Sequence, residues 1–212
     1  MSWHGRLDYQ AALQLMELRR AELIAGERSE GELVLCEHPP VITCGRHSHT
    51  DNVLLSEREL KRRGIALAKI DRGGDVSYHG PGQLMIYPVV RVGVRVHAFL
   101  QSLSEALAEL AKSYGVSQAR WRGDEPGLWV DDRKLAACGI HLSQGVSIHG
   151  FSLNVSTPSA AWECIVPCGL SGPGPVSLAE LVAPGLSVPS IQEVAERSLP
   201  LLRDALAEYG LG

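Results

Sequence analysis

The chain has 212 residues, of which 45% are hydrophobic and 21% are charged, with a net charge of −4. These proportions are typical of a globular protein and exclude a disordered chain, a collagen-like repeat and a charged tail. The acidic balance argues against a nucleic-acid-binding protein. No apolar stretch approaches the roughly 20 residues that cross a bilayer, and the amino terminus lacks a signal-like apolar region. We therefore expect a cytoplasmic protein without a nucleic-acid or membrane partner, folded as one domain over residues 1–212.

The first predicted element is a helix over residues 9–24, because apolar side chains recur there at helical spacing, with Asp8 before them and a glycine at position 26. Residues 32–37 and 41–43 have the pattern of strands, separated by two prolines. Ser56 and Glu59 form a capping box, which predicts a short helix that Gly64 ends. Residues 65–70 are predicted to form the next strand.

The segment 71–83, DRGGDVSYHGPGQ, has four glycines and one proline and predicts a loop without regular structure. A strand over residues 84–90 and an amphipathic helix over 99–114 follow. Further strands are expected at residues 128–130, 134–140 and 147–155. In the last quarter we expect a turn at Pro167-Cys168-Gly169, capping boxes of Ser177 with Glu180 and Ser190 with Glu193, and a kink of the terminal helix at Pro200. This order of hairpins and helices indicates an α+β fold.

The glycine loop is the segment most suggestive of a ligand. Glycines at Gly73, Gly74, Gly80 and Gly82 allow backbone N–H groups to approach a phosphate, a carboxylate or an acyl carbonyl. The alternative interpretation is a wide turn that contacts no ligand. The pattern is neither a P-loop nor a Rossmann fingerprint.

Cys168 is the cysteine placed best for chemistry, because a proline and a glycine flank it on a predicted turn. Such a thiol needs a nearby cation or base, and Lys134, which begins an otherwise apolar strand, is the best candidate. His79 and His149 are rival bases. The remaining cysteines are expected to be buried and inert; they are Cys36, Cys44, Cys138 and Cys164.

Two short pairs of potential metal ligands stand alone in the sequence. They are His47 with His49 and Cys164 with Cys168, and neither has a matching second pair. We therefore expect neither a metal nor a cofactor.

A series of motifs in chain order resembles the lipoyl(octanoyl) transferases, a family similar in fold to the biotin and lipoate protein ligases. The motifs are Glu37-His38-Pro39-Pro40-Val41, Arg72-Gly73-Gly74, Tyr78-His79-Gly80-Pro81-Gly82-Gln83-Leu84, Gly127-Leu128-Trp129-Val130, Arg133-Lys134-Leu135-Ala136, His149-Gly150-Phe151-Ser152-Leu153-Asn154-Val155 and Ile165-Val166-Pro167-Cys168-Gly169. The resemblance covers most of the chain. It implies an α+β fold with mixed and antiparallel sheets flanked by helices.

The resemblance also implies a mechanism. A cysteine at the position of Cys168 takes an octanoyl group from octanoyl-acyl carrier protein as a thioester, and a lysine at the position of Lys134 assists it. The implied acceptors are lysines in lipoyl domains of 2-oxoacid dehydrogenase complexes and in the glycine cleavage H protein. The implied substrate-binding residues are Arg72, Gly73, Gly74, Asp75, Val76, Ser77, Tyr78, His79, Ala137, Cys138, Gly139, Gly150, Phe151 and Ser152. Cys138 departs from the family pattern as a second thiol near Lys134.

Two other functions fit the same scaffold. An ATP-dependent lipoate or biotin ligase would need no Cys168, and a non-catalytic acyl-binding or lipoyl-domain-binding protein would need neither Cys168 nor Lys134. Because acyl carrier proteins are acidic as a class, a basic rim is expected to dock the donor. Its candidates are Arg46, Arg72, Arg91 and Arg122.

Overall fold

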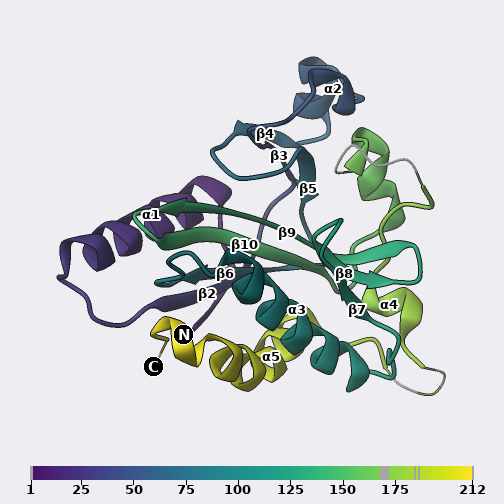
Figure 1. Ribbon diagram of the computed structural model, residues 1–212. Helices are drawn as coiled ribbons and strands as arrows, with labels where there is room; N and C mark the ends of the chain where they lie inside the picture. Colours follow the sequence, from purple (N-terminus) through teal and green to yellow (C-terminus); the bar gives the residue numbers. More distant parts are fainter. Residues whose placement is uncertain (1, 168–171, 184, 186, 212) are drawn as a thin grey trace.

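The computed structural model describes residues 2–167, 172–183, 185 and 187–211 (Figure 1). A seven-stranded sheet has the order β1-β2-β6-β10-β9-β8-β7, and a three-stranded sheet has the order β4-β3-β5. The strands are β1 (Ser2–Arg6), β2 (Glu32–Glu37), β3 (Val41–Cys44), β4 (Ala66–Lys69), β5 (Val76–His79), β6 (Gln83–Val89), β7 (Arg120–Arg122), β8 (Gly127–Val130), β9 (Arg133–Ser143) and β10 (Val146–Asn154). The pairs β1–β2 and β3–β4 are parallel and the others antiparallel. The predicted mixed sheets are therefore confirmed.

The large sheet is covered by helices on both faces, with α1 on one side and α3 and α5 on the other (Figure 1). The helices are α1 (Tyr9–Ala25), α2 (Glu57–Arg62), α3 (Val96–Lys112), α4 (Leu178–Leu181) and α5 (Ile191–Leu206), with 3₁₀ turns η1 (Thr50–Asn52), η2 (Ser159–Cys164) and η4 (Ala207–Tyr209). In β6, Leu84 and Ile86 join the core beneath α3 and α5, whereas Met85 and Tyr87 pack on the side of α1. This alternation explains why every residue of β6 is buried. No helix of the described ranges is long and apolar enough to cross a bilayer.

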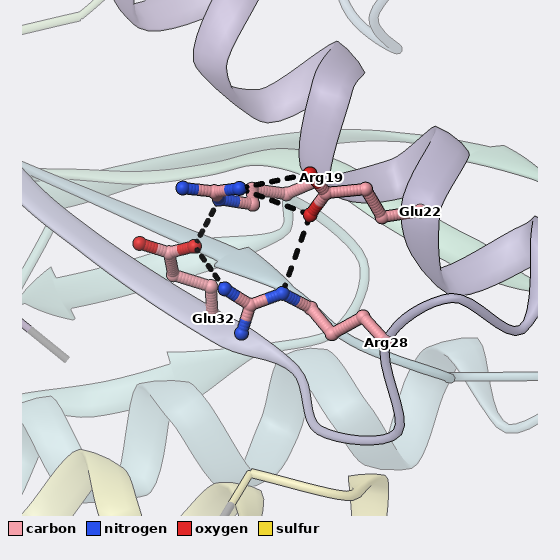
Figure 2. Close-up of polar contacts among 4 residues, drawn as sticks. All are labelled: Arg19, Glu22, Arg28 and Glu32. Carbon is pink, nitrogen blue, oxygen red and sulfur yellow. Dashed lines mark hydrogen bonds and ion pairs between the residues drawn. The ribbon is translucent and has the colours of Figure 1, made fainter.

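A network of alternating charges ties the end of α1 to β2 (Figure 2). Arg19 lies 3.0 Å from Glu22 and 2.6 Å from Glu32, and Arg28 lies 3.4 Å from each of the same two carboxylates. The side chains are only partly exposed, so the network contributes more than one isolated surface pair. It fixes the helix whose first residue, Tyr9, reaches the cavity described below.

Most predicted helix starts and ends are confirmed. Asp8 and Ser56 cap α1 and α2, Ser177 and Glu180 form the capping box of α4, and Ser190 caps α5. Gly26 ends α1 in the left-handed conformation, at φ 77°. The helix α5 continues across Pro200.

Several predictions about strands are wrong. The segment 71–83 contains β5, because residues 76–79 pair with β3 despite the glycines around them. The edge strands β1 and β7 were not predicted. The strand at 134–140 extends to Ser143 and joins β10 through a two-residue turn, Gln144-Gly145, with φ values of 47° and 76°. The turn predicted at Pro167-Cys168-Gly169 reaches outside the described residues.

Candidate active site

A cavity of about 480 Å³ lies where the glycine loop of the small sheet faces β9 and β10 of the large sheet. The predicted site residues that line it are Arg72, Gly73, Gly74, Asp75, Ser77, His79, Lys134, Ala137, Cys138, Gly139, Gly150, Phe151 and Ser152. Lining residues that the sequence motifs did not single out are Tyr9, Ile70, Met85, Tyr87, Leu100, Asp124, Glu125, Pro126 and Ile140. Segments far apart in the sequence thus form one chamber with a largely apolar wall.

Two residues of the predicted set, Val76 and Tyr78, lie outside this cavity. They alternate along β5 with Ser77 and His79, so their side chains point to the other face of the strand. There they pack in a small core with Ile42 and line a separate space of about 20 Å³.

Three glycines allow the cavity walls to approach each other. A Cβ at Gly139 would lie 2.9 Å from the carbonyl oxygen of Gly73, and one at Gly45 would lie 2.4 Å from that of Gly74. A Cβ at Gly150 would lie 2.1 Å from the Ile86 oxygen in the neighbouring strand. Because real Cβ contacts are essentially never this short, larger residues would push the glycine loop and β10 out of place.

Arg72 holds the glycine loop to β3. It is only 6% exposed, and its Nη2 donates to the carbonyl oxygen (3.0 Å) and the hydroxyl oxygen (2.9 Å) of Thr43. Its Nη1 donates to the carbonyl oxygen of Gly73 at 2.9 Å. The Thr43 hydroxyl accepts from Arg72, since a guanidinium can only donate. Because the Gln83 amide oxygen takes the ring proton on Nδ1 of His79, the Thr43 proton points to Nε2 of His79, 3.2 Å away.

The same chain of hydrogen bonds continues from His79 through β6 to β10. With its Nε2 accepting, His79 donates from Nδ1 to Oε1 of Gln83 at 2.7 Å. Gln83 then donates to Oδ1 of Asn154 at 2.9 Å, and Asn154 donates to the carbonyl oxygens of Val176 (3.1 Å) and Lys134 (3.4 Å). A single directed network therefore connects the glycine loop to the start of β9.

This network makes His79 a poor general base. Burial, opposed by the Gln83 hydrogen bond and reinforced by the charge of Arg72, lowers the pKa of His79 to about 3, and both ring nitrogens already have partners. Burial and then Arg72 also lower the pKa of His149 to about 3. His149 Nε2 has no hydrogen-bond partner among the described residues. Both rings are neutral at physiological pH, and His149 is the less engaged of the two.

Asp75 also lines the cavity but serves the loop itself. Its Oδ1 accepts from the backbone N–H of His49 (3.1 Å) and of Val76 (2.8 Å), and its Oδ2 accepts from the amide of Asn52. The carboxylate thus fastens the η1 turn to the glycine loop.

Lys134 reaches the cavity because β9 contains a bulge. Trp129 pairs with Lys134 and Leu128 pairs with Ala136, so Leu135 is the extra residue. A simple alternation would place Lys134 on the same face as Ala136, which is fully buried in the core. The bulge reverses this and turns Lys134 to the face of Ala137, where it lines the cavity. Its Nζ lies 4.7 Å from the centre of the Trp129 ring.

Cys168 lies outside the described residues. The residue before it, Pro167, lines two smaller cavities together with Lys134. Of the cysteines predicted to be buried, Cys36 and Cys164 are buried, whereas Cys44 and Cys138 are partly exposed. The partial exposure of Cys138 reflects its place in the cavity wall.

The thiols of Cys36, Cys44 and Cys164 all have a pKa above the ordinary cysteine value. Burial raises the pKa of the Cys36 thiol to about 12 and also raises the pKa of Cys44 and Cys164. Their thiols are protonated at neutral pH. Within the described part of the chain, no group of three or more histidine, cysteine or acidic side chains could hold a metal ion.

The comparisons with known proteins decide the family. The family described as "Lipoyl protein ligase A/B catalytic domain" matches residues 8–200. An octanoyltransferase from Solibacter usitatus is 43% identical over 196 residues, which cover 91% of this chain and 86% of that protein. An octanoyltransferase from Alkaliphilus metalliredigens is 43% identical over 186 residues, covering 84% and 83%. The chain belongs to the octanoyltransferase family. It is an acyltransferase enzyme.

Solved structures support the fold of this octanoyltransferase-family chain. A bipartite lipoate protein ligase from Thermoplasma acidophilum superposes with a TM-score of 0.70 at 17% identity, over 98% of this chain and 84% of that one. Lipoate-protein ligase A bound with ATP superposes with a TM-score of 0.68 at 14% identity, over 98% and 86%. At these identities the likeness concerns the fold alone, and it confirms the predicted lipoate-ligase architecture.

The arginines expected to form a basic rim are in different surroundings. Arg72 is buried, and Arg91 donates to the carbonyl oxygen of Leu23. Arg46 is exposed and paired with Asp71, while Arg122 lies over the Trp129 ring at 4.5 Å. Burial removes Arg72 from the four, and Arg46, Arg91 and Arg122 remain candidates for contact with a partner of this octanoyltransferase-family enzyme.

Proposed function

We propose that the protein transfers an octanoyl group from octanoyl-acyl carrier protein to a lysine of a lipoyl domain, through a thioester on Cys168 that Lys134 assists. The observation that carries the proposal is the position of Lys134. It lines the large, mostly apolar cavity and also two smaller spaces lined by Pro167, the residue before Cys168. These positions support a site in which Lys134 lies between an acyl pocket and the residue that precedes the proposed nucleophile.

The large cavity suits an eight-carbon chain. Its apolar lining includes Met85, Leu100, Ile140 and Phe151. Burying about six methylenes contributes on the order of 5 kcal/mol before the ordering costs of binding. The chain would lie along the paired strands β9 and β10, with its carbonyl at the Lys134 end.

In the first step the Cys168 thiolate attacks the carbonyl carbon of the donor thioester. The bond from that carbon to the pantetheine sulfur breaks, and the departing sulfur takes a proton from the Lys134 ammonium. The enzyme then carries an S-octanoyl group and a neutral Lys134 amine. One thioester replaces another, so no ATP is required.

In the second step the acceptor lysine becomes the nucleophile. Its ammonium gives one proton to the Lys134 amine, and its nitrogen attacks the thioester carbonyl. The carbon–sulfur bond to Cys168 breaks, the new amide loses its remaining proton to water, and the thiolate–ammonium pair is restored. We propose the lipoyl domains of 2-oxoacid dehydrogenase complexes and the glycine cleavage H protein as acceptors.

The test is octanoyl transfer from octanoyl-acyl carrier protein to a purified lipoyl domain without ATP. The native chain should transfer, and Lys134→Ala should lose about 100-fold or more of the rate, the usual contribution of a general acid–base group. Lys69→Ala, an exposed lysine on β4, is the matched control and should keep the native rate. A requirement for ATP would favour the ligase, and an unchanged rate in Lys134→Ala would exclude the assigned role.

A further inference from the structure

A second cavity, of about 300 Å³, shares the lining residues Lys134 and Glu125 with the large cavity described above. Its other walls are Arg122, Trp129 and Asp132, with Pro167 and residues 172–175 along one side. The acyl chain fills the first cavity in the proposed mechanism. The second cavity therefore offers the incoming nucleophile a separate approach to the same lysine.

The wall of the second cavity formed by Trp129 already binds cations. The ring is 5% exposed, with the Arg122 guanidinium 4.5 Å and the Lys134 ammonium 4.7 Å from its centre. The indole Nε1 donates to the carbonyl oxygen of Glu125 at 2.9 Å, which fixes the ring. An aromatic face held in this way attracts positively charged groups.

The carboxylates of this cavity are not equivalent. Glu125 is 3.8 Å from Nη1 of Arg122, so its charge is partly balanced. Asp132 is exposed in the β8–β9 turn and has no ion pair within the ranges that the structure describes. While Lys134 is an ammonium, the two cations and two carboxylates of this cavity balance. Once the proposed first step has left Lys134 as a neutral amine, an aromatic wall and one net negative charge remain, and this composition attracts a primary ammonium.

We propose that this second cavity receives the lysine side chain of the acceptor protein, whose ammonium is attracted by Asp132 and passes along Trp129 to Lys134. The inference rests on the proposed function, because it assumes an acyl-enzyme that an amine then attacks. The ammonium gives its proton to the neutral Lys134 amine before the nitrogen attacks, as in the second step above.

The experiment separates the two half-reactions in Asp132→Asn. Acyl-enzyme formation is followed with octanoyl-acyl carrier protein, and the isolated acyl-enzyme is then mixed with a lipoyl domain or with hydroxylamine, a small nucleophile that is uncharged at neutral pH. We expect transfer to the lipoyl domain at low salt to slow about two- to fivefold, the effect of one exposed charge. Acyl-enzyme formation and the hydroxylamine reaction should keep their native rates.

Asp131→Asn is the matched control. Asp131 is the neighbouring residue, carries the same charge and does not line the cavity, and its φ of 53° is one that asparagine adopts readily. It should transfer at the native rate. Equal slowing in both variants, or slower acyl-enzyme formation in Asp132→Asn with unchanged transfer, would overturn the inference, the latter by assigning the cavity to the donor. If the native chain forms no acyl-enzyme, the proposed function itself fails.

Discussion

Lys134 lies directly opposite Trp129 in the β8–β9 ladder, with its ammonium nitrogen 4.7 Å from the centre of the indole ring. Both residues are placed by backbone geometry, Lys134 by the bulge at Leu135 and Trp129 by its hydrogen bond to Glu125. A lysine has four rotatable bonds, and contact with a fixed aromatic face reduces the conformations open to it. The amine is therefore positioned before any substrate binds.

Gly127 provides the room in which the Lys134 side chain lies. A Cβ at Gly127 would be 2.7 Å from the carbonyl oxygen of Ala136, so β8 and β9 would have to move apart, and 3.3 Å from Cε and 3.4 Å from Cδ of Lys134; its φ is 153°. We expect Gly127→Ala to lower the free energy of unfolding by about 1 to 2 kcal/mol. It should also slow octanoyl transfer about 10- to 100-fold, because moving the Lys134 ammonium by about 1 Å lowers the rate of the reaction that it assists.

The control for this substitution is Gly64→Ala. Gly64 has a φ of 68°, and a Cβ at this position would meet nothing within 4 Å, so the substitution tests the backbone strain alone. It should lose stability and keep its transfer rate, whereas Gly127→Ala also disturbs the strand β9 that carries Lys134. Equal transfer rates in the two variants, measured at equal folded fractions, would show that Gly127 does not position Lys134.

Thr43 joins Arg72 to His79 through one hydroxyl group. Thr43→Val keeps the shape of the side chain but removes that group, leaving two buried polar partners unsatisfied. We expect the free energy of unfolding to fall by about 1 to 3 kcal/mol. Acyl-enzyme formation should slow, because Arg72 then keeps only one of its two hydrogen bonds to Thr43, that to the carbonyl oxygen, and holds the glycine loop less firmly to β3.

Thr157→Val tests whether this effect is specific. Thr157 is also buried, and its hydroxyl donates to the carbonyl oxygen of Gly82 at 3.0 Å without contacting Arg72. It should lose stability but acylate at the native rate. The account of Arg72 fails if both threonine variants acylate equally fast.

The buried histidines make stability depend on pH. In the folded chain the pKa of His79 and of His149 is about 3, against an ordinary value of 6.5. The unfolded chain therefore binds more protons between pH 6.5 and pH 3, and the free energy of unfolding falls as the pH falls through that window. Each histidine contributes a slope that approaches about 1.4 kcal/mol per pH unit.

Urea unfolding at pH 7.5, 6.5 and 5.5 measures this slope. His79→Gln should be less stable than the native chain at pH 7.5 yet lose less stability on acidification. His47→Gln, which changes an exposed histidine, should show the native slope. Identical slopes in the native chain and in His79→Gln would contradict the assignment of a neutral buried ring.

Much of the fold could be predicted because its signals are local. Asp8, Ser56 and Ser190 each satisfy a backbone N–H at a helix start, so a short motif suffices to predict the boundary. The strand β5 could not be predicted in this way, because its pairing with β3 depends on residues more than 30 positions away. The glycines on either side of residues 76–79 favour a loop, but the hydrogen bonds to β3 hold these residues in a strand.

Many residues of the cavity wall could be predicted from the sequence, but their geometry could not. Motif resemblance selected most residues of the cavity wall. It could not show that Ser77 and His79 face the cavity while Val76 and Tyr78 face away, because this alternation belongs to β5, a strand that was not predicted. The bulge that turns Lys134 toward the cavity follows from strand register, which sequence spacing alone does not reveal. Tyr9 and Tyr87 carry no local signal and enter the wall through packing of α1 on β6.

The central claim is a thioester on Cys168. Intact-protein mass after mixing with octanoyl-acyl carrier protein, without ATP, tests it directly in the native chain, in Cys168→Ser and in Cys138→Ser. The account predicts one octanoyl adduct, released by hydroxylamine, in the native chain and in Cys138→Ser, and none in Cys168→Ser. A native chain that remains unmodified, or an adduct that persists in Cys168→Ser and disappears in Cys138→Ser, would contradict it.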